Sequence, residues 1–202
     1  IAAHWALDQG LARRVLIMDW DVHHGNGTQH AFWEDPRVLF ISTHRYPFYP
    51  GTGDVNEVGK GAGEGYTVNI PLPGGTDDAA YLRVFRELVD PIARRFEPDL
   101  VLISAGFDAH ERDPLGGMAV TEPGFGAMMT ILGRIADDHA GGRAVAVLEG
   151  GYDLLALERS VARVLLAMGG EEQPAEGLEG DEESVSAVIQ KVKTRIAPYW
   201  KL

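Results

Sequence analysis

Residues 15–27 read Val15-Leu16-Ile17-Met18-Asp19-Trp20-Asp21-Val22-His23-His24-Gly25-Asn26-Gly27. Four apolar residues in a row, 15–18, indicate a buried β-strand, because a strand covered on both faces has no polar side to show. Carboxylates and imidazoles follow directly, before two glycines. In an extended segment side chains alternate, so Asp19, Asp21 and His23 point to the same side. The stretch therefore predicts a buried strand that ends in a polar, ligand-binding turn.

Four more short apolar runs have the same character, at residues 38–42, 66–70, 100–104 and 144–148. Longer segments with apolar residues at three- and four-residue steps separate them and predict helices. This alternation is typical of an α/β fold with a mostly parallel sheet flanked by helices. The apolar helix faces are Tyr81, Val84, Phe85, Leu88, Val89, Ile92 and Phe96, with a kink expected at Pro91; Phe125, Met128, Leu132 and Ile135; and Leu157, Val161, Val164, Leu165 and Met168.

Composition and charge narrow the class of protein. The 202 residues amount to about one domain, with a net charge of −12 and no cysteine. A negative chain repels a phosphate backbone, so we expect no direct binding to nucleic acid. No apolar run reaches the roughly 20 residues that span a bilayer, so we expect a cytoplasmic protein without a membrane segment. The lack of cysteine leaves histidine and carboxylates as metal ligands.

The last 32 residues differ from the rest of the chain. Residues 171–183 are acidic and aperiodic and predict a solvated loop. Residues 184–202 predict a helix that packs on the domain through one apolar face, formed by Val185, Val188, Ile189, Val192 and Ile196.

Chemically informative side chains follow the predicted strands, and such strand ends meet at one edge of a parallel sheet. Two carboxylates and an imidazole within residues 19–23 form half of a divalent-metal site, and Asp108 is placed to add a ligand from another strand end. Few histidines and many oxygens suit zinc or another borderline transition metal. A hydrogen-bonded polar turn is the alternative, and the convergence of the whole cluster favours the metal. The residues concerned are Asp19, Asp21, His23 and His24; Ser42 and His44; Asp108 and His110; and Glu149 and Tyr152.

Tyr152 follows the last predicted strand in the sequence Glu149-Gly150-Gly151-Tyr152. Paired glycines let the backbone pass close to a ligand, and the tyrosine hydroxyl is then able to donate a hydrogen bond to an oxyanion. The simpler alternative is a turn with a packed ring.

Several motifs, in this order, resemble those of the histone deacetylase superfamily, which also contains acetoin utilisation proteins and acetylpolyamine amidohydrolases. The chain looks like a bacterial member closer to class II than to class I. The motifs are Asp-Trp-Asp-Val-His-His-Gly-Asn-Gly-Thr at 19–28, Ser-Thr-His at 42–44, Pro-Gly-Thr-Gly-Asp at 50–54, Asn-Ile-Pro-Leu at 69–72, Ser-Ala-Gly-Phe-Asp-Ala-His at 104–110, Asp-Pro-Leu-Gly at 113–116 and Leu-Glu-Gly-Gly-Tyr-Asp at 148–153.

The resemblance implies a three-layer, arginase-like fold and a zinc hydrolase that removes an acetyl or similar acyl group from an amine. It assigns one zinc ion per chain to Asp21, His23 and Asp108, and an oxyanion-stabilising role to Tyr152. It also implies structural potassium or sodium ions, and an acyl-lysine tunnel. The cation residues are Asp19, Ser42 and Thr43 at one site and Phe32, Asp35, Val38 and Tyr66 at another; the tunnel residues are Phe48, Tyr49 and Leu115.

One element of the family pattern is missing from these residues. In the family a tandem histidine pair acts as general base and acid, and Asp19 and Asn26 correspond to the residues that orient it. We therefore interpret residues 1–170 as the C-terminal portion of a deacetylase domain that lacks its N-terminal part. The 202 residues alone are expected to be inactive, and either to self-associate through exposed apolar surface or to belong to a longer polypeptide.

Two other functions stay open. One is a manganese ureohydrolase of the same fold, which binds two metals. The other is a non-catalytic module that binds acyl-lysine or acts as a scaffold. Leu115 is apolar, and no acidic residue is evident at the tunnel mouth, so an acetylated lysine or small acyl amine is favoured over a polyamine.

Overall fold

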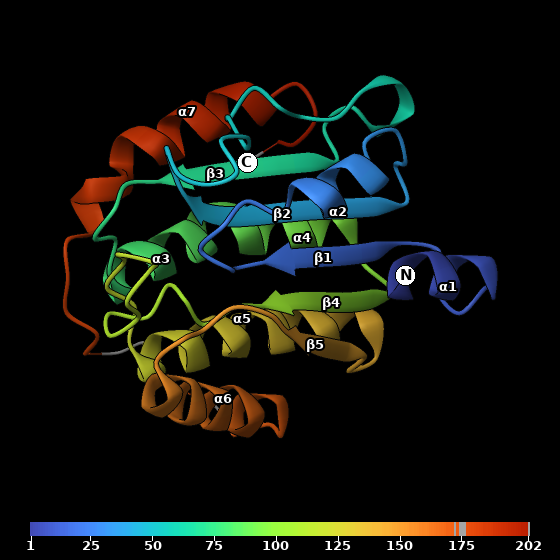
Figure 1. Ribbon diagram of the computed structural model, residues 1–202. Helices are drawn as coiled ribbons and strands as arrows, with labels where there is room; N and C mark the ends of the chain where they lie inside the picture. The colour runs from blue at the N-terminus through green and yellow to red at the C-terminus, as the bar shows by residue number, and fades with distance from the viewer. Residues whose placement is uncertain (172, 174–176, 202) are drawn as a thin grey trace.

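The computed structural model describes residues 1–171, 173 and 177–201, and within them the chain forms a five-stranded parallel sheet (Figure 1). The order across the sheet is β3-β2-β1-β4-β5, which puts β1 at the centre. This arrangement confirms the predicted α/β class, with helices against a parallel sheet. The strands are β1 (Val15–Asp19), β2 (Val38–Arg45), β3 (Thr67–Leu72), β4 (Leu100–Ala105) and β5 (Ala144–Leu148).

Seven α-helices of the described residues surround the sheet. In Figure 1, α4 and α5 lie behind the sheet and α2 lies in front of it. They are α1 (Ala2–Asp8), α2 (Asn26–Ala31), α3 (Asp78–Val84), α4 (Asp90–Phe96), α5 (Glu122–Ala140), α6 (Leu154–Met168) and α7 (Ser186–Ile196), with short helical turns η1 (Gly61–Gly63), η2 (Phe85–Val89) and η3 (Glu182–Val185).

Strand β2 is longer than its apolar run predicts. It continues to Arg45, so Ser42 and His44 lie within the strand and not after it. The reason is pairing: Ser42 stands beside Asn69 of β3, and His44 stands beside Pro71. A proline is tolerated in β3 because this strand lies at the edge of the sheet, where one side of its backbone needs no partner.

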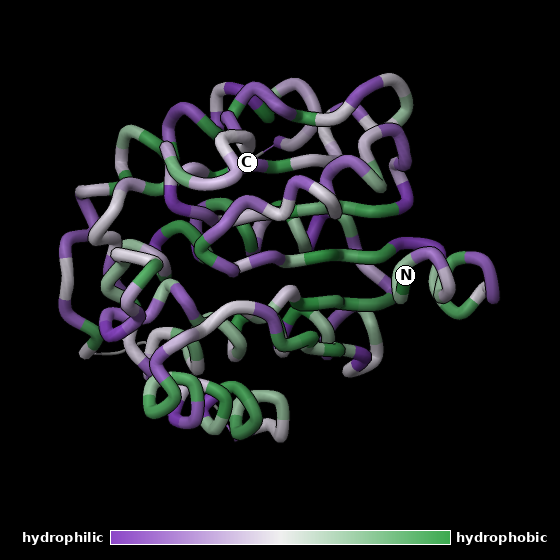
Figure 2. Tube along the Cα trace, viewed as in Figure 1, coloured by the Kyte–Doolittle hydropathy of each residue, from purple (hydrophilic) through white to green (hydrophobic). Residues whose placement is uncertain are grey.

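The two faces of the sheet bury very different amounts of apolar surface. The face that carries Leu16, Met18 and Ile41 packs against α3, α5 and α7, and we call it the large-core face. The face that carries Val15 and Ile17 packs against a small set of residues, Ala3 and Ala6 of α1 together with Ala12 and Phe32, and we call it the small-core face. Figure 2 shows the central strands as hydrophobic along most of their length.

The expected kink near Pro91 takes the form of a π-helical turn, η2, between α3 and α4. Proline cannot donate a backbone hydrogen bond, and such turns absorb the resulting irregularity. Its apolar residues Phe85, Leu88 and Val89 are all buried in the large core.

The buried face of helix α6 differs from the face that the sequence predicts. Val164 is buried as expected, but Leu165 and Met168 are exposed, and the buried face instead includes Ala156, Ser160 and Ala167. The apolar periodicity of this helix therefore continues onto a side that no described residue covers.

The predicted solvated loop of residues 171–183 is not exposed along its whole described length. Residues 172 and 174–176 lie outside the described part of the chain, but Gln173 is buried and its backbone N–H donates to Thr130 Oγ1 at 3.0 Å. In the following helix, Val185, Ile189, Val192 and Ile196 are buried in the large core.

Strand β5 leaves apolar side chains exposed on the small-core face. Val145 stands beside Leu102 and is 47% exposed, and Val147 stands beside Ser104 and is 51% exposed. A hollow of about 540 Å³, lined in part by Trp5, Leu102 and Val147, lies on the same face. Exposed apolar strands of this kind favour association with other protein surfaces.

We expect the 202-residue chain by itself to self-associate through this face. Replacing Val145 and Val147 with threonine keeps the β-branched shape but lowers the apolar area, so the double variant should have a lower mass average in light scattering. A wild-type chain that stays a 21.9 kDa monomer at all concentrations would contradict the expectation.

Candidate metal centre

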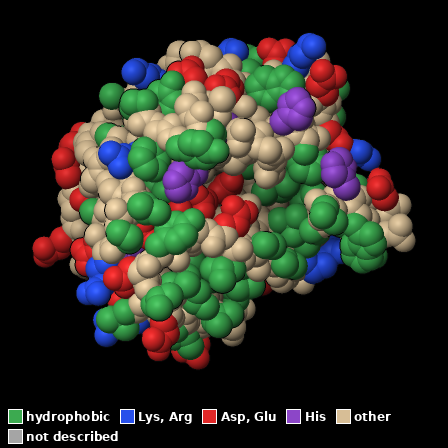
Figure 3. All heavy atoms as spheres, viewed as in Figure 1, with side chains coloured by type: hydrophobic (Ala, Val, Ile, Leu, Met, Phe, Trp, Pro, Cys, Tyr) green, Lys and Arg blue, Asp and Glu red, His purple; other side chains and the backbone are tan. Residues whose placement is uncertain are grey.

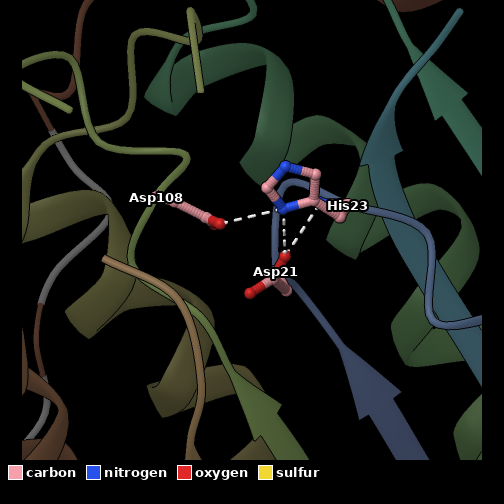
Figure 4. Close-up of side chains that lie close together, drawn as sticks. All are labelled: Asp21, His23 and Asp108. Carbon is pink, nitrogen blue, oxygen red and sulfur yellow. Dashed lines mark hydrogen bonds and ion pairs between the residues drawn. The ribbon is translucent and has the colours of Figure 1, made fainter. Parts of the chain in front are cut away.

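Three side chains of types that bind metals meet beyond the carboxyl ends of two adjacent strands (Figure 4). Asp21 and His23 follow β1, and Asp108 follows β4. His23 Nδ1 lies 3.0 Å from Asp21 Oδ1 and 3.1 Å from Asp108 Oδ2. Possible ligand atoms of the three residues lie within 4.8 Å of one another. The structure thus brings together the residues that the resemblance assigned to zinc.

Backbone pairing fixes these side chains in place. β1 and β4 run side by side from Val15 and Leu100, and Trp20 N continues the ladder to Ser104 O at 3.2 Å. The other Asp108 oxygen, Oδ1, accepts a hydrogen bond of 2.8 Å from Val22 N. The pairing of the strands therefore determines how far apart the two carboxylates stand.

Two glycines make room for the paired carboxylates. A Cβ atom at Gly106 would collide with the side chain of Asp21, and one at Gly150 would collide with the carboxylate of Asp108. Gly150 N also donates to Asp21 Oδ2 at 3.1 Å. Any side chain at these positions would push the carboxylates out of the site.

The charges of the site favour a bound cation. Burial and the neighbouring charge of Asp21 raise the pKa of Asp108 to about 7. Among the described residues, no donor makes a hydrogen bond with the buried Asp108 Oδ2. A buried carboxylate oxygen without a donor costs free energy unless something positive compensates it. Two carboxylates and an imidazole nitrogen fit zinc, so the residues present suit the metal.

Two aromatic side chains, Phe48 and Tyr49, lie next to His23, and we call them the aromatic wall. The ring of Phe48 stacks on that of His23 at 5.3 Å between centroids, and Tyr49 approaches the same ring edge-on at 6.1 Å. Figure 3 shows acidic and histidine side chains near the middle of this face with apolar side chains around them. Two of the three expected tunnel residues, Phe48 and Tyr49, thus lie against the ring of His23.

The third expected tunnel residue, Leu115, is joined to this wall through Arg45. The Arg45 guanidinium lies 4.5 Å from the centre of the Phe48 ring, and its Nη1 donates to Gly116 O at 3.1 Å. Leu115 itself is exposed. Sequence reasoning did not single out Arg45, although it directly follows the Ser-Thr-His motif.

The residues expected at the two monovalent-cation sites lie in two groups. Asp19 pairs with Ser42 across β1 and β2, and Thr43 Oγ1 donates to Asp19 O at 3.4 Å. Burial and the charges of Glu149 and Asp21 hold the pKa of Asp19 well above its usual range. The second group lies around the α2–β2 turn, and its hydrogen bonds are Asp35 N to Phe32 O, Val38 N to Asp35 O and Phe40 N to Tyr66 O.

Tyr152 and Asn26 occupy exposed positions. The Tyr152 side chain is 57% exposed, and its backbone N–H donates to Asp113 Oδ2 at 2.8 Å. Asn26 is the first residue of α2 and is exposed. Tyr152 lies two residues after Gly150, whose N–H donates to Asp21 Oδ2. Asn26 follows Gly25, where an added Cβ would collide with the Asp19 carboxylate.

A buried polar network that the sequence did not reveal holds the loop with the aromatic wall. His24 Nε2 lies 3.0 Å from Gln29 Oε1, and Gln29 Nε2 donates to Glu57 Oε2 at 2.6 Å. His44 Nε2 contacts Gly53 O at 3.0 Å. Burial, with a smaller effect of His24, lowers the pKa of His44 to about 3, so this ring is neutral. The two histidines and Gln29 are structural residues of the site.

The model of the histone deacetylase domain matches residues 1–168. The chain belongs to the histone deacetylase family. It is 45% identical over 200 residues to histone deacetylase 10, chloroplastic, of Oryza sativa, and 50% identical over 171 residues to a probable deacetylase of Archaeoglobus fulgidus. These matches include 96% and 84% of this chain but only 45% and 47% of the relatives. This deacetylase-family chain therefore spans about half the length of those relatives.

Solved histone deacetylase structures share the fold. The HD domain of HDA15 matches with a TM-score of 0.87 and 41% identity, over 98% of this chain and 54% of that one. The histone deacetylase Clr3 matches with a TM-score of 0.90 and 38% identity, over 98% of this chain and 34% of the Clr3 chain. These matches confirm the expected deacetylase-like fold.

Two further expectations concern the setting of the protein. No helix among the described residues has the length and apolar character needed to cross a membrane. The sequence relatives named above come from a plant and an archaeon, so a bacterial source stays a prediction.

Gly106 offers a direct test of how tightly the carboxylates are packed. Gly106→Ala should destabilise the fold by about 1–3 kcal/mol, as overpacking does, and weaken zinc binding because Asp21 must move. Urea unfolding and zinc titration measure the two effects. Gly133→Ala is the matched control, since no atom within 4 Å meets its added Cβ and alanine favours a helix. Equal behaviour of the two variants would contradict the packing argument.

Proposed function

We propose that the protein carrying this chain hydrolyses an acyl amide, such as acetylated lysine, with one zinc ion held by Asp21, His23 and Asp108. The observation that carries the proposal is the cluster of Asp21, His23 and Asp108, in which the buried Asp108 Oδ2 lies 3.1 Å from His23 Nδ1 and makes no hydrogen bond with the described residues. Membership of the deacetylase family supports the reaction class. Bound here, zinc supplies Lewis-acid activation of the amide carbonyl and of water.

The chain's own residues would act around that centre. The Tyr152 hydroxyl would donate a hydrogen bond to the carbonyl oxygen as negative charge develops on it, which lowers the energy of the transition state more than that of the substrate. Asp19 and Asn26 would orient the two histidines that the family pattern places outside residues 1–202. In this proposal the general base and acid come from those histidines.

The substrate class follows from the aromatic wall. Phe48 and Tyr49 stand against the ligand His23, and Arg45 ties Phe48 to the turn that bears Leu115. Apolar and aromatic side chains of this kind suit the methylene stem of an acylated lysine, and Phe48, Tyr49 and Leu115 themselves have no carboxylate to attract a polyamine. We therefore propose an acylated lysine or a small acyl amine as substrate.

A monovalent cation, potassium or sodium, is proposed beside Asp19, Ser42 and Thr43. The support is the buried Asp19 carboxylate, whose raised pKa reflects burial and neighbouring negative charges. A cation there would relieve the same repulsion. A second cation is proposed at the turn of Phe32, Asp35 and Val38 near Tyr66.

The second candidate function is acyl-lysine binding without hydrolysis. It rests on the aromatic rings of Phe48 and Tyr49 against His23, which would hold an acyl-lysine stem whether or not the amide is then cleaved. Metal analysis and an acetyl-lysine assay, on this chain and on any longer protein that contains it, separate the possibilities. One zinc with hydrolysis supports the deacetylase, two manganese ions support a ureohydrolase, and peptide binding without turnover supports the second candidate.

Asp108→Asn tests the metal centre because it removes the charge and keeps the shape. Changes to outer-shell partners of metal sites typically cost about 10- to 100-fold in affinity, so loss of a ligand should cost at least as much. Zinc titration measures the change. Asp99→Asn is the control, since Asp99 lies outside the site, where it accepts backbone hydrogen bonds from Arg13 and Arg14 and forms an ion pair with the Arg13 side chain. Stoichiometric zinc in Asp108→Asn at wild-type affinity would disprove the assignment.

Tyr152→Phe tests the proposed oxyanion donor in the active protein. Removal of one preorganised donor typically lowers kcat by about 10²- to 10³-fold. Zinc content should stay the same, because the ring is not a ligand. If kcat is unchanged, the ring has only a packing role.

A further inference from the structure

One buried carboxylate, that of Asp113, connects two separate segments of the site, the turn at Leu115 and the backbone of Tyr152. Asp113 is 8% exposed and belongs to the loop between β4 and α5. Its Oδ1 accepts hydrogen bonds from Leu115 N at 2.9 Å and Gly116 N at 3.0 Å. Its Oδ2 accepts one from Tyr152 N at 2.8 Å. A single side chain thus contacts the segment of a tunnel residue and the backbone of the proposed oxyanion donor.

The two oxygens of Asp113 do separate work. An aspartate that closes a turn with its own following residues needs one acceptor oxygen, and Oδ1 serves that turn here. Oδ2 reaches 39 residues along the chain, so the turn does not explain it. Hydrogen bonds to an ionised carboxylate are stronger than neutral ones, which suits a long-range anchor.

The segment that Oδ2 holds also has contacts on either side of Tyr152, since Phe107 N donates to Gly150 O at 2.7 Å and Arg112 Nη2 donates to Asp153 Oδ2 at 3.3 Å. It begins with Gly150 and Gly151, and Gly151 has a φ of +134° that side chains rarely adopt. The Tyr152 ring is 57% exposed, so packing constrains it weakly. On the inner side, Gly150 N binds Asp21 Oδ2. The two glycines therefore lie between the hydrogen bond of Gly150 with Asp21 and the hydrogen bond of Tyr152 with Asp113.

The turn that Oδ1 closes is itself firmly placed. A Cβ at Gly116 would collide with the backbone carbonyl of Asp108, so this turn packs directly on the chain at a metal ligand. Arg45 holds Gly116 O from the side of the aromatic wall. Asp113 thus links Tyr152 to a turn whose own position is set by the Asp108 backbone and by Arg45.

We propose that Asp113 is a positioning residue that holds the Tyr152 backbone in register with the metal site and with the tunnel wall at Leu115. This inference rests on the proposed function, since it assigns Tyr152 as the group that is positioned. Preorganised donors are effective because they need no rearrangement as charge develops, and a misplacement of about 1 Å is able to cost roughly 100-fold in rate.

Asp113→Asn separates the two tasks of the carboxylate. The amide keeps one acceptor oxygen, which satisfies two N–H groups on the turn and only one at Tyr152, so it should stay with the turn. The amide nitrogen would then face Tyr152 N, donor against donor. In the active protein we expect kcat to fall about 10- to 100-fold with unchanged zinc content.

A double-mutant cycle shows whether Asp113 acts through Tyr152. In a Tyr152→Phe background, Asp113→Asn should lower kcat by less than about 3-fold, because the hydroxyl that it positions is already gone. Multiplicative losses in the double variant would overturn the proposal. Asp99→Asn is the matched control: it makes the same chemical change at a carboxylate that binds Arg13 and Arg14 outside the site, so kcat should stay near the wild-type value in both backgrounds.

Amide hydrogen exchange followed by NMR provides a readout that needs no turnover. Asp113→Asn should speed exchange at Tyr152 and leave Leu115 and Gly116 protected, while the Asp99→Asn control should change none of the three. Unchanged exchange at Tyr152 would show that Asp113 does not hold the segment. A wild-type protein without hydrolysis would refute the proposed function, yet the exchange result would still decide whether the anchor exists.

Discussion

The mutual repulsion of Asp21 and Asp108 is the constraint around which this molecule is organised. Both carboxylates are buried beyond neighbouring strands, where water screens their charges poorly. β1 and β4 bring them close, the absence of side chains at Gly106 and Gly150 lets them stay close, and the imidazole of His23 stands between them. A fold gains nothing from such an arrangement unless a cation joins it, so the geometry itself argues for a metal.

Much of this could be predicted from sequence, because it depends on local pattern. Buried parallel strands require continuous apolar runs, and all five runs became strands. Ligands beyond the carboxyl ends of such strands must converge, which is why Asp21, His23 and Asp108 were found from their places after the first and fourth runs. The family motifs supplied the rest of the expected site, and the comparison with known deacetylases supports the fold that they imply.

What could not be predicted depends on contacts between distant segments. Strand β2 continues through Ser42 and His44 because it pairs with β3 there, and the sequence of β2 by itself does not predict that pairing. The periodicity of α6 could not show that Leu165 faces outward, since that depends on what lies opposite. Asp113 was visible only as a member of a motif. Its tie to Tyr152 crosses from the β4–α5 loop to the segment after β5, and only three-dimensional structure reveals such a bond.

The placement of Asp21, His23 and Asp108 just beyond β1 and β4 also bears on how the molecule folds. The hydrogen bond from Val22 to Asp108 joins residues 86 positions apart, and β2, β3 and the α3–α4 helix lie between them in the chain. Closing so long a loop costs chain entropy before any contact rewards it, and parallel pairings of this kind slow folding. The cluster of Asp21, His23 and Asp108 is therefore assembled only when the central strands have paired, so the proposed zinc site would form late in folding and zinc uptake would report on native topology.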